Sequence, residues 1–498
     1  MVHVASQDAP RPEGDRSSSG TGGYPRRPRR WVGALVAVLV AALVLILALA
    51  LPRFLGDRSQ DPGAEPEAVD TSGDPATPTP TATPVKLPGS TVTAIDGVLD
   101  GAPAQNTGAV VADPATGDLL YERNPDQPVT PASNQKILTE LSLFHHADVE
   151  DRLATTVVAG KTPSSVVLVA GGDTLLSPGE SNPKAVMGHA GVATLAEETA
   201  RSMARETDRD DFPDRIEVDL DTSVFEGPAT NDAWLPGDVA AGEVGPVAPI
   251  AFGSHTVPGP DGRPTDTHDD DAARTVAEVF AGELSAELSE RTGQPVSVEV
   301  GQPVKAAEGR ELGRVESATL EEQATVMMQD SDNRLAEVLG RMAAVKSGHP
   351  GSVQGARKAT EEALREALGR DVTAEDGVVV GDNCGMAPTN RVTARVLAGI
   401  LLLGEQDAPN RYTPMISTFP VSGDSGTLED RFDDPTEAAG RGVVRAKTGT
   451  LNTVTALSGR VTRDDGERMI AVVLFDGVQD TGVARNRADE FFATLAQS

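Results

Sequence analysis

Near the C-terminus the sequence reads Val443-Val-Arg-Ala-Lys-Thr-Gly-Thr450, then Val454 to Thr462, then Met469-Ile-Ala-Val-Val-Leu-Phe475. These are three short apolar runs, and Arg463-Asp-Asp-Gly466 before the last of them has the composition of a tight turn. The pattern predicts three strands, with the most apolar one in the centre of a sheet. Apolar residues at helical spacing from Val483 to Leu495 then predict an amphipathic closing helix.

The beginning of the folded region, which we expect to extend from about Val92 to Ser498, predicts a hairpin and a helix. Ala109-Val-Val-Ala112 and Asp118-Leu-Leu-Tyr121 are short strands around a turn that contains Pro and Gly. A helix is predicted to start at Pro131, because large apolar residues follow on one stripe: Ile137, Leu138, Leu141 and Phe144. The two chain ends together predict one antiparallel sheet and an α+β fold.

The middle of the chain has a different pattern. Thr155 to Ala159, Ser165 to Val169 and Ile216 to Leu220 have the composition of strands, and Gly- and Pro-rich segments separate them. We therefore expect residues 158–312 to be an inserted, strand-rich accessory region of one or two small domains. The main domain is then divided into residues 91–157 and 313–498.

The N-terminus predicts the location of the protein. Residues 1–30 form a basic tail, and Trp31 to Leu51 is a run of 21 uncharged residues, long enough to cross a bilayer as one helix. The arginines of residues 26–30 predict that the tail stays in the cytoplasm and that the rest is exported. A cleaved signal peptide is the alternative, but Ala-Leu-Pro-Arg-Phe after the run is a poor cleavage site. Residues 52–90, rich in Pro and Thr, are expected to be an extended linker on the outer side of the cytoplasmic membrane.

Composition excludes several functions. The chain has 498 residues, with 43 Lys+Arg against 75 Asp+Glu and a net charge of −32, which argues against nucleic acid as a partner. The single cysteine, Cys384, excludes an intramolecular disulfide framework and a cysteine-based zinc ribbon. The pair His145–His146 is more consistent with a helix end than with a metal site, and we expect no metal and no cofactor.

Ser133-Asn-Gln-Lys136 is the first of three short motifs with reactive side chains. Residues i and i+3 share a helix face, so the amine of Lys136 can reach the hydroxyl of Ser133 at the first helical turn. A serine needs a base to take its proton, and a lysine can serve when burial or a nearby cation keeps it neutral. A second copy, Ser181-Asn-Pro-Lys184, is interpreted as an exposed loop because Pro183 interrupts it.

Ser331-Asp-Asn333 is the second motif. In an extended turn Ser331 and Asn333 face the same cleft, and the helix that follows holds them in place. The alternative is structural, with Ser331 or Asp332 simply capping that helix.

Lys447-Thr-Gly-Thr450 is the third motif and ends a predicted strand. Alternation places Thr448 and Thr450 on one face, where two hydroxyl groups beside a lysine suit a carboxylate. Gly449 lets another backbone come close, and a substrate peptide can lie along this strand as an added strand. The alternative is an exposed strand end with a turn.

Together, in this order, the three motifs are the signature of serine penicillin-recognising proteins. The chain resembles the D-alanyl-D-alanine carboxypeptidase/endopeptidase family, the low-molecular-mass class C penicillin-binding proteins, from about Val92 to Ser498. Similar class A β-lactamases lack the long insertion needed between Ser133 and Ser331. Other segments that carry the resemblance are Asp113 to Asn124, Gly171-Gly-Asp173, Trp234-Leu-Pro-Gly-Asp238, Ser331 to Glu337 and Gly426-Thr-Leu428 before Arg431.

The resemblance implies a β-lactamase/transpeptidase-like α/β/α sandwich that carries the insertion as extra small domains. It implies that Ser133 is the acylated nucleophile, that Lys136 accepts its proton, and that Ser331, with Lys447 behind it, passes a proton to the leaving D-alanine. The other implied roles are the substrate amide for Asn333, the terminal carboxylate for Thr448 and Thr450, and an oxyanion hole from the backbone N–H groups of Ser133 and Thr450. Lys136 and Lys447 should depress each other's pKa.

Some positions depart from the family pattern. Asp382-Asn-Cys-Gly-Met386 stands where the family usually has Asp-Gly-Ser-Gly-Leu, and Cys384 is expected to be a buried small side chain rather than a reactive thiol. Pro388 stands where some members have an arginine for the peptide's diamino acid. Asp238, Met386 and Leu451 match other positions of the substrate pocket only loosely.

The sequence therefore predicts an anchored serine DD-peptidase that acts on peptidoglycan stem peptides and is acylated by β-lactams. A β-lactamase-like hydrolase and a non-catalytic wall-binding protein are the alternatives. An esterase with a Ser-His-Asp triad is weaker, because no Gly-x-Ser-x-Gly elbow occurs and no histidine lies near the motifs. The balance between carboxypeptidase and endopeptidase activity stays open.

Overall fold

A computed structural model describes residues 86–498 except 206–210, 306–308, 373 and 407–409. The predicted cytoplasmic tail, membrane anchor and most of the linker lie outside these described residues. Among the described residues, no helix has both the length and the apolar character that crossing a membrane requires.

One five-stranded sheet combines the two ends of the chain, in the order β10-β11-β12-β1-β2. All its neighbouring strands are antiparallel, and β12 lies in the centre between β11 and β1. The predicted meander, its apolar central strand and the pairing of both chain ends are therefore confirmed. The strands are β1 (Asn106–Ala112), β2 (Leu119–Arg123), β10 (Val444–Leu451), β11 (Val454–Thr462) and β12 (Arg468–Asp476).

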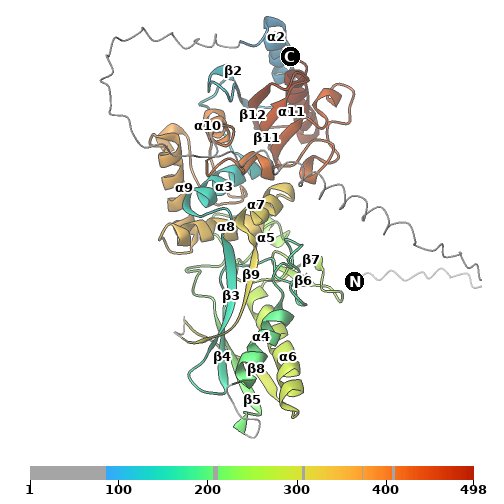
Figure 1. Ribbon diagram of the computed structural model, residues 1–498. Coiled ribbons are helices and arrows are strands. Elements are labelled where there is room, and N and C mark those ends of the chain that lie inside the picture. The colour runs from blue at the N-terminus through green and yellow to red at the C-terminus, as the bar shows by residue number, and fades with distance from the viewer. Residues whose placement is uncertain (1–85, 206–210, 306–308, 373, 407–409) are drawn as a thin grey trace, which may run out of the picture. The chain divides into compact units, whose positions relative to one another are not determined.

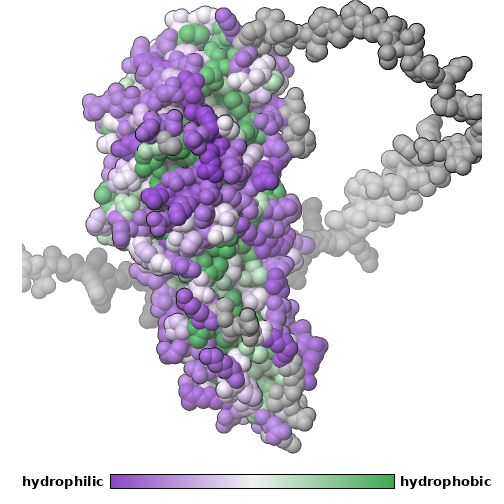
Figure 2. Space-filling view, turned by 90° about the vertical axis from the view of Figure 1, so that its left-hand side faces the viewer, coloured by the Kyte–Doolittle hydropathy of each residue, from purple (hydrophilic) through white to green (hydrophobic). Residues whose placement is uncertain are grey.

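Both faces of this sheet are apolar, because alternate residues of its strands enter two different cores. In β12, Val472 packs in the core on one face and Val473 in the core on the other. Helices α2 (Gly89–Asp100) and α11 (Thr481–Ala496) cover one face (Figure 1). The other face is covered by a helical layer that consists of α3 (Gln135–His146), α7 (Leu320–Gln329), α8 (Asn333–Lys346), α9 (Val353–Leu368) and α10 (Ala394–Gly404). The outer surface is mostly hydrophilic, with narrower apolar areas between the polar ones (Figure 2).

A second sheet, with its own core, lies in the middle of the chain in the order β8-β5-β4-β3-β9 (Figure 1). Strand β3 is antiparallel to both of its neighbours, whereas β4, β5 and β8 are parallel. The strands are β3 (Arg152–Ala159), β4 (Ser165–Val169), β5 (Arg215–Asp221), β8 (Ser297–Pro303) and β9 (Glu311–Thr319).

This middle region is less purely β than its sequence suggested. It contains α4 (Val192–Ala204) and the 21-residue α6 (Ala272–Thr292), which pack on the second sheet. The parallel pairs explain the helices, because a parallel connection needs a crossover of a dozen or more residues. A short helix and a small hairpin complete the region: α5 (Pro236–Ala240), β6 (Thr256–Pro258) and β7 (Pro264–His268).

The chain leaves the helical layer from α3 into β3 and returns from β9 into α7. Thr319 caps α7 in a capping box with Glu322, which fixes the return. The expected division at residues 158 and 312 remains a prediction, although strands of the second sheet begin at Arg152 and end at Thr319. Short 3-10 turns lie at η2 (Ala132–Asn134), η4 (Ala374–Asp376), η5 (Met415–Thr418), η6 (Gly426–Leu428) and η7 (Ala438–Gly440).

Candidate active site

Ser133 lies in the 3-10 turn η2, directly before α3, rather than in the first turn of the α-helix that its sequence predicted. The turn starts from Ala132, whose φ of 48° is in the left-handed region. The spacing argument still holds, because the Nζ atom of Lys136 lies 3.2 Å from the Oγ atom of Ser133.

Lys136 is completely buried, and three chain segments surround its amine. Besides Ser133, its Nζ atom contacts Oδ1 of Asn333 at 2.7 Å and the backbone oxygen of Cys384 at 2.8 Å. Burial lowers the pKa of Lys136, while nearby acidic groups, Asp382 among them, act in the opposite direction. The site therefore holds a lysine whose neutral form is favoured relative to a lysine in water.

Ser331 and Asn333 flank Asp332, the residue that caps α8, so the two sequence interpretations of this motif are compatible. The Asp332 carboxylate caps the helix by accepting a hydrogen bond from the N–H of Leu335 at 2.9 Å. This leaves Ser331, with a φ of 57°, and Asn333 free to face the site. The amide nitrogen of Asn333 donates to the backbone oxygen of Glu243 at 2.9 Å, so its oxygen is directed at Lys136.

Lys447 lies on β10 and is also fully buried. Its Nζ atom donates to Oγ of Ser331 at 2.9 Å and to the backbone oxygen of Thr448 at 3.0 Å. Burial and then the charge of Lys136 hold the pKa of Lys447 well below its usual range, and Arg431 adds to this. The pKa of Lys136 itself is lowered by burial.

The end of β10 packs closely on the turn that carries Ser133. A Cβ atom added to Gly449 would lie 2.8 Å from Nδ2 of Asn134 and 3.0 Å from the oxygen of Pro131, so only glycine fits without displacement. The Asn134 amide also donates to the oxygen of Lys447 at 3.3 Å. Thr450, the residue after Gly449, is exposed.

Thr448 is almost buried, and its hydroxyl donates to the hydroxyl of Thr427 at 2.8 Å. It therefore belongs to the wall of the site, while Thr450 marks the open end of the strand.

The loop of residues 382–387 is a structural part of the site whose role the sequence did not reveal. The buried carboxylate of Asp382 accepts three backbone N–H bonds, from Gly385, Met386 and Ala387, at 2.6–3.0 Å. It also accepts bonds from three side chains: Trp234 at 2.9 Å, Cys384 at 3.3 Å and Asn390 at 2.7 Å. This network fixes the loop that presents the Cys384 oxygen to Lys136.

Gly385 brings this loop against the turn that carries Ser133. Its φ is 101°, and a Cβ atom at this position would lie 2.0 Å from the oxygen of Ala132 and 3.0 Å from the N–H nitrogen of Ser133. A glycine in the family pattern was visible in the sequence, but the turn on which it packs was not.

Cys384 is fully buried, and burial followed by the nearby Asp382 raises the pKa of its thiol well above the usual value. The geometry agrees with the interpretation of a buried small side chain, because a thiol is a poor nucleophile while it stays protonated.

Glu337, Asp382 and Cys384 bring one ligand atom each within 4.8 Å of one another. Both oxygens of Glu337 accept hydrogen bonds from Asn383, at 2.7 and 3.0 Å, and Asp382 is used as described. The hydrogen bonds that hold the loop explain why these side chains lie together. The expected absence of a metal remains a prediction.

Three residues match the pocket only loosely: Asp238, Met386 and Leu451. Their side chains make no hydrogen bond to the residues of the three motifs. Asp238 is half-buried in α5, and its backbone oxygen accepts from Glu243, the residue that holds Asn333. Met386 is half-buried in the 382–387 loop, and Leu451 ends β10. Their roles stay predictions.

The second Ser-x-x-Lys copy lies far along the chain in the middle region. Lys184 is exposed, and neither it nor Ser181 belongs to a helix. The Ser181 hydroxyl instead accepts a hydrogen bond from the N–H of Gly191 at 2.9 Å.

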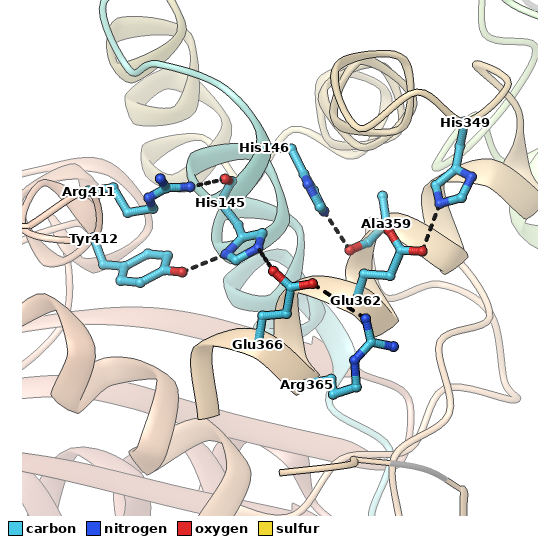
Figure 3. A network of polar contacts seen from close by, with 9 residues as sticks. All are labelled: His145, His146, His349, Ala359, Glu362, Arg365, Glu366, Arg411 and Tyr412. Carbon is cyan, nitrogen blue, oxygen red and sulfur yellow. Dashed lines mark hydrogen bonds and ion pairs between the residues drawn. The ribbon is translucent and has the colours of Figure 1, made fainter. Parts of the chain in front are cut away.

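The histidine pair is at the end of α3, as expected for a helix end (Figure 3). His145 contacts the Tyr412 hydroxyl at 2.6 Å and Glu366 at 3.1 Å, and His146 contacts the backbone oxygen of Ala359 at 2.9 Å. The two rings brace α3 against α9 and the segment that follows α10.

Known proteins resemble the chain over about three quarters of its length. A carboxypeptidase of Mycobacterium tuberculosis is 33% identical over 362 residues, which cover 72% of this chain and 73% of that protein. Carboxypeptidase DacB of Mycolicibacterium smegmatis is 31% identical over 392 residues, covering 77% and 79%. A D-alanyl-D-alanine carboxypeptidase of Actinomadura is 29% identical over 434 residues, covering 76% and 78%.

The fold is that of solved penicillin-binding proteins. The structure of penicillin-binding protein 4 from Haemophilus influenzae superposes with a TM-score of 0.63 at 18% identity, covering 81% of this chain and 99% of that one. The family profile of the D-Ala-D-Ala carboxypeptidase 3 (S13) family matches residues 92–259 and 260–498. The chain therefore belongs to the D-Ala-D-Ala carboxypeptidase 3 (S13) family of hydrolases.

Proposed function

We propose that the protein removes the terminal D-alanine from peptidoglycan stem peptides through an acyl-enzyme on Ser133. The observation that carries the proposal is the buried Lys136 amine at 3.2 Å from the Ser133 hydroxyl. A nucleophile and its base within this reach, with a third group that orients the base, are the general requirement for covalent catalysis.

The hydrogen bonds of Lys136 support a role as general base. A neutral amine has two N–H bonds and one lone pair. If the two N–H bonds point to the oxygens of Asn333 and Cys384, at 2.7 and 2.8 Å, the lone pair is left for the Ser133 O–H. In the acylation step the serine oxygen bonds to the penultimate D-alanine carbonyl carbon, and its proton moves to the amine. General-base assistance of this kind contributes about 10²–10⁴ in rate.

The second pair, Lys447 and Ser331, is placed for the leaving group. Cleavage of the peptide bond requires a proton on the nitrogen of the departing D-alanine. The Ser331 hydroxyl gives that proton and is resupplied by Lys447, 2.9 Å away, whose lowered pKa eases the transfer. Water then attacks the acyl carbon, and the bond from that carbon to the Ser133 oxygen breaks. The Ser133 oxygen takes its proton back from Lys136, and the shortened peptide leaves as a carboxylate. The proton lost by the new carboxylic acid is taken up through solvent by Lys447.

The free edge of β10 offers a track for the peptide. The N–H of Ala446 and the oxygen of Val444 are used by Pro420 and Ser422, which cover the first half of that edge. By strand alternation, Thr448 and Thr450 direct their backbone groups to the same edge beyond the covered part. A peptide added here puts its terminal carboxylate near the two threonine hydroxyls and its scissile carbonyl near the N–H groups of Thr450 and Ser133.

A mass-spectrometric acylation experiment tests this function. The full chain is incubated with a penicillin, and the intact mass is compared for wild type, Ser133→Ala and Ser181→Ala. We expect one slowly hydrolysed adduct that only Ser133→Ala loses, and release of D-alanine from a stem pentapeptide by the same proteins. No adduct and no D-alanine from folded wild type would favour a non-catalytic wall-binding protein, and rapid turnover of penicillin would favour a β-lactamase.

We further propose that residues 31–51 anchor the protein in the cytoplasmic membrane, with the N-terminus inside and residues 91–498 on the wall side. The support is the uncharged run with arginines before it. Extraction of cell membranes with carbonate should leave the full chain in the pellet, whereas a chain that lacks residues 1–51 should not sediment.

A further inference from the structure

Three arginines on neighbouring strands line one pocket outside the catalytic cluster. Arg445 on β10, Arg460 on β11 and Arg468 on β12 surround a space of about 390 Å³. Polar groups of Gln406, Thr413 and Ser417 also line this space, which we call the arginine pocket.

The pocket carries more positive charge than its one acid neutralises. The buried carboxylate of Glu405 accepts from Arg460 at 2.7 Å and from Arg468 at 2.8 Å. Arg445 instead donates to the backbone oxygens of Ser417 and Phe419, at 2.9 and 3.1 Å, and pairs with no acid among the described residues. Among the described residues that line the pocket, three cations and one anion leave a net charge of +2, within a chain whose net charge is −32.

The close placement of these arginines costs folding free energy, and packing alone does not explain why they lie together. Arg445 and Arg460 are directly opposite each other in the β10–β11 register, and like charges in that position are destabilising. The pKa of Arg445 is lowered by burial and then by the charge of Arg460, while Asp424 acts in the opposite direction. The Nε atom of Arg460 is buried without a hydrogen-bond partner among the described residues.

A purely structural role accounts for only part of the cluster. Arg460 and Arg468 lie at the C-terminal end of α10, where Glu405 is the cap residue and cations favour the helix dipole. That explanation does not apply to Arg445, which donates to backbone oxygens and does not pair with Glu405.

The arginine pocket is a neighbour of the active site. Arg445 and Lys447 share a face of β10 and are about 7 Å apart along the strand, from the rise of an antiparallel strand. Gln329, two residues before Ser331, donates to the oxygen of Thr418, next to the residues whose carbonyls hold Arg445. A ligand in the pocket would thus lie beside β10, the strand along which we propose that the peptide binds, without touching the reacting atoms.

We propose that the arginine pocket binds a doubly charged oxyanion of the wall polymer, either paired peptide carboxylates or a phosphate. Guanidinium groups recognise both through paired, charge-assisted hydrogen bonds. The pocket then serves as an exosite that holds the polymer while the catalytic cluster cuts a stem peptide. The inference rests on the proposed function only for the identity of the polymer.

Titration with small dianions tests the binding. The full chain in detergent is titrated calorimetrically with succinate and with inorganic phosphate, as wild type and as Arg445→Gln/Arg468→Gln. The control Arg215→Gln/Arg463→Gln removes two surface charges outside the pocket. We expect one dianion at least to bind wild type and control, and to bind the pocket variant about 100-fold more weakly, from about 10-fold per arginine.

The two probes separate the sources of the ligand. Binding of succinate alone identifies peptide carboxylates, and binding of phosphate identifies a phosphate-bearing polymer. No binding to wild type, or equal binding to both variants, overturns the proposal. If the double variant fails to fold, Arg468→Gln alone gives the same comparison with a tenfold loss, because Glu405 still pairs with Arg460.

The effect on the polymer is measured with isolated cell-wall sacculi. Co-sedimentation should fall about tenfold or more for the pocket variant, while acylation of Ser133 by penicillin stays within twofold of wild type. Loss of acylation in wild type would refute the proposed catalytic function and leave the pocket's anion binding standing. Unchanged sedimentation together with intact acylation would overturn the exosite.

Discussion

Replacing Gly385 by alanine should damage the active site more than it damages the fold. The added Cβ atom would lie 2.0 Å from the oxygen of Ala132, so the two loops must separate by about 1 Å or more to reach an ordinary contact. A non-glycine residue in the left-handed region costs about 1–2 kcal/mol, and overpacking adds about 1–3 kcal/mol. The free energy of unfolding should therefore fall by about 2–5 kcal/mol.

The catalytic effect follows from the position of the clash. The Ala132 peptide carries the backbone of Ser133, so a shift of about 1 Å displaces the nucleophile from Lys136 and from the proposed oxyanion hole. A misplacement of that size costs about 10²-fold in rate. We expect the second-order rate constant for acylation by a labelled penicillin to fall about 100-fold.

Gly466→Ala is a matched control for this experiment. Gly466 has a φ of 88°, similar to that of Gly385, but no atom lies within 4 Å of its added Cβ. This control isolates the backbone cost of about 1–2 kcal/mol and should acylate at the wild-type rate. Urea unfolding and acylation kinetics are measured for both. Acylation of Gly385→Ala within threefold of Gly466→Ala would refute the argument that this glycine fixes the nucleophile turn.

Three further predictions concern buried charged groups. Lys136→Met should lower the penicillin acylation rate by about 10²–10⁴ while the chain still folds, and wild-type rates in that variant would exclude Lys136 as the base. Asp382→Asn should lower the free energy of unfolding by about 3 kcal/mol or more, because the new amide places its own N–H groups against the N–H donors that the carboxylate accepts from. An equal loss for the exposed Asp118→Asn would contradict this. Burial raises the pKa of Asp173 to about 7, so the folded state holds its proton more tightly and stability should fall as pH rises from about 4 to about 7. Asp173→Asn should flatten that part of the pH–stability curve in urea titrations, and an unchanged curve would show that Asp173 does not titrate there.

The main sheet could be predicted from sequence because both its faces are buried by short, strongly apolar strands. Residues 469–475 are apolar throughout, as expected for a strand that packs helices on each side. The middle region was harder to predict. Its strand-like segments were recognised, whereas the helices α4 and α6 between them were not. Their existence follows from the parallel pairing of β4, β5 and β8, and pairing direction has no local sequence signal.

The juxtaposition of the three motifs was predictable because each motif fixes its own local geometry. The i, i+3 spacing brings Ser133 to Lys136, and strand alternation directs Lys447 to the face where Ser331 lies. The role of Asp382 was not predictable, because its six hydrogen-bond donors come from its own loop, from Trp234 and from Asn390 only after folding. The role of a buried carboxylate depends on its hydrogen-bond partners. The sequence alone does not identify those partners.

The two Ser-x-x-Lys copies show that the spacing of the motif alone does not determine its reactivity. Both have the same spacing, yet Lys184 is exposed, while Lys136 is enclosed by the oxygens of Asn333 and Cys384. An exposed lysine amine near pH 7 is protonated and has no lone pair to offer. The surroundings of Lys136 change this in two ways. Burial favours the neutral amine, and the two oxygens determine the direction of its lone pair. The reactivity expected of Ser133 therefore depends on segments 200 and 250 residues away as much as on its own motif, and variants of Asn333 that keep its volume but lose its oxygen should slow acylation without unfolding the chain.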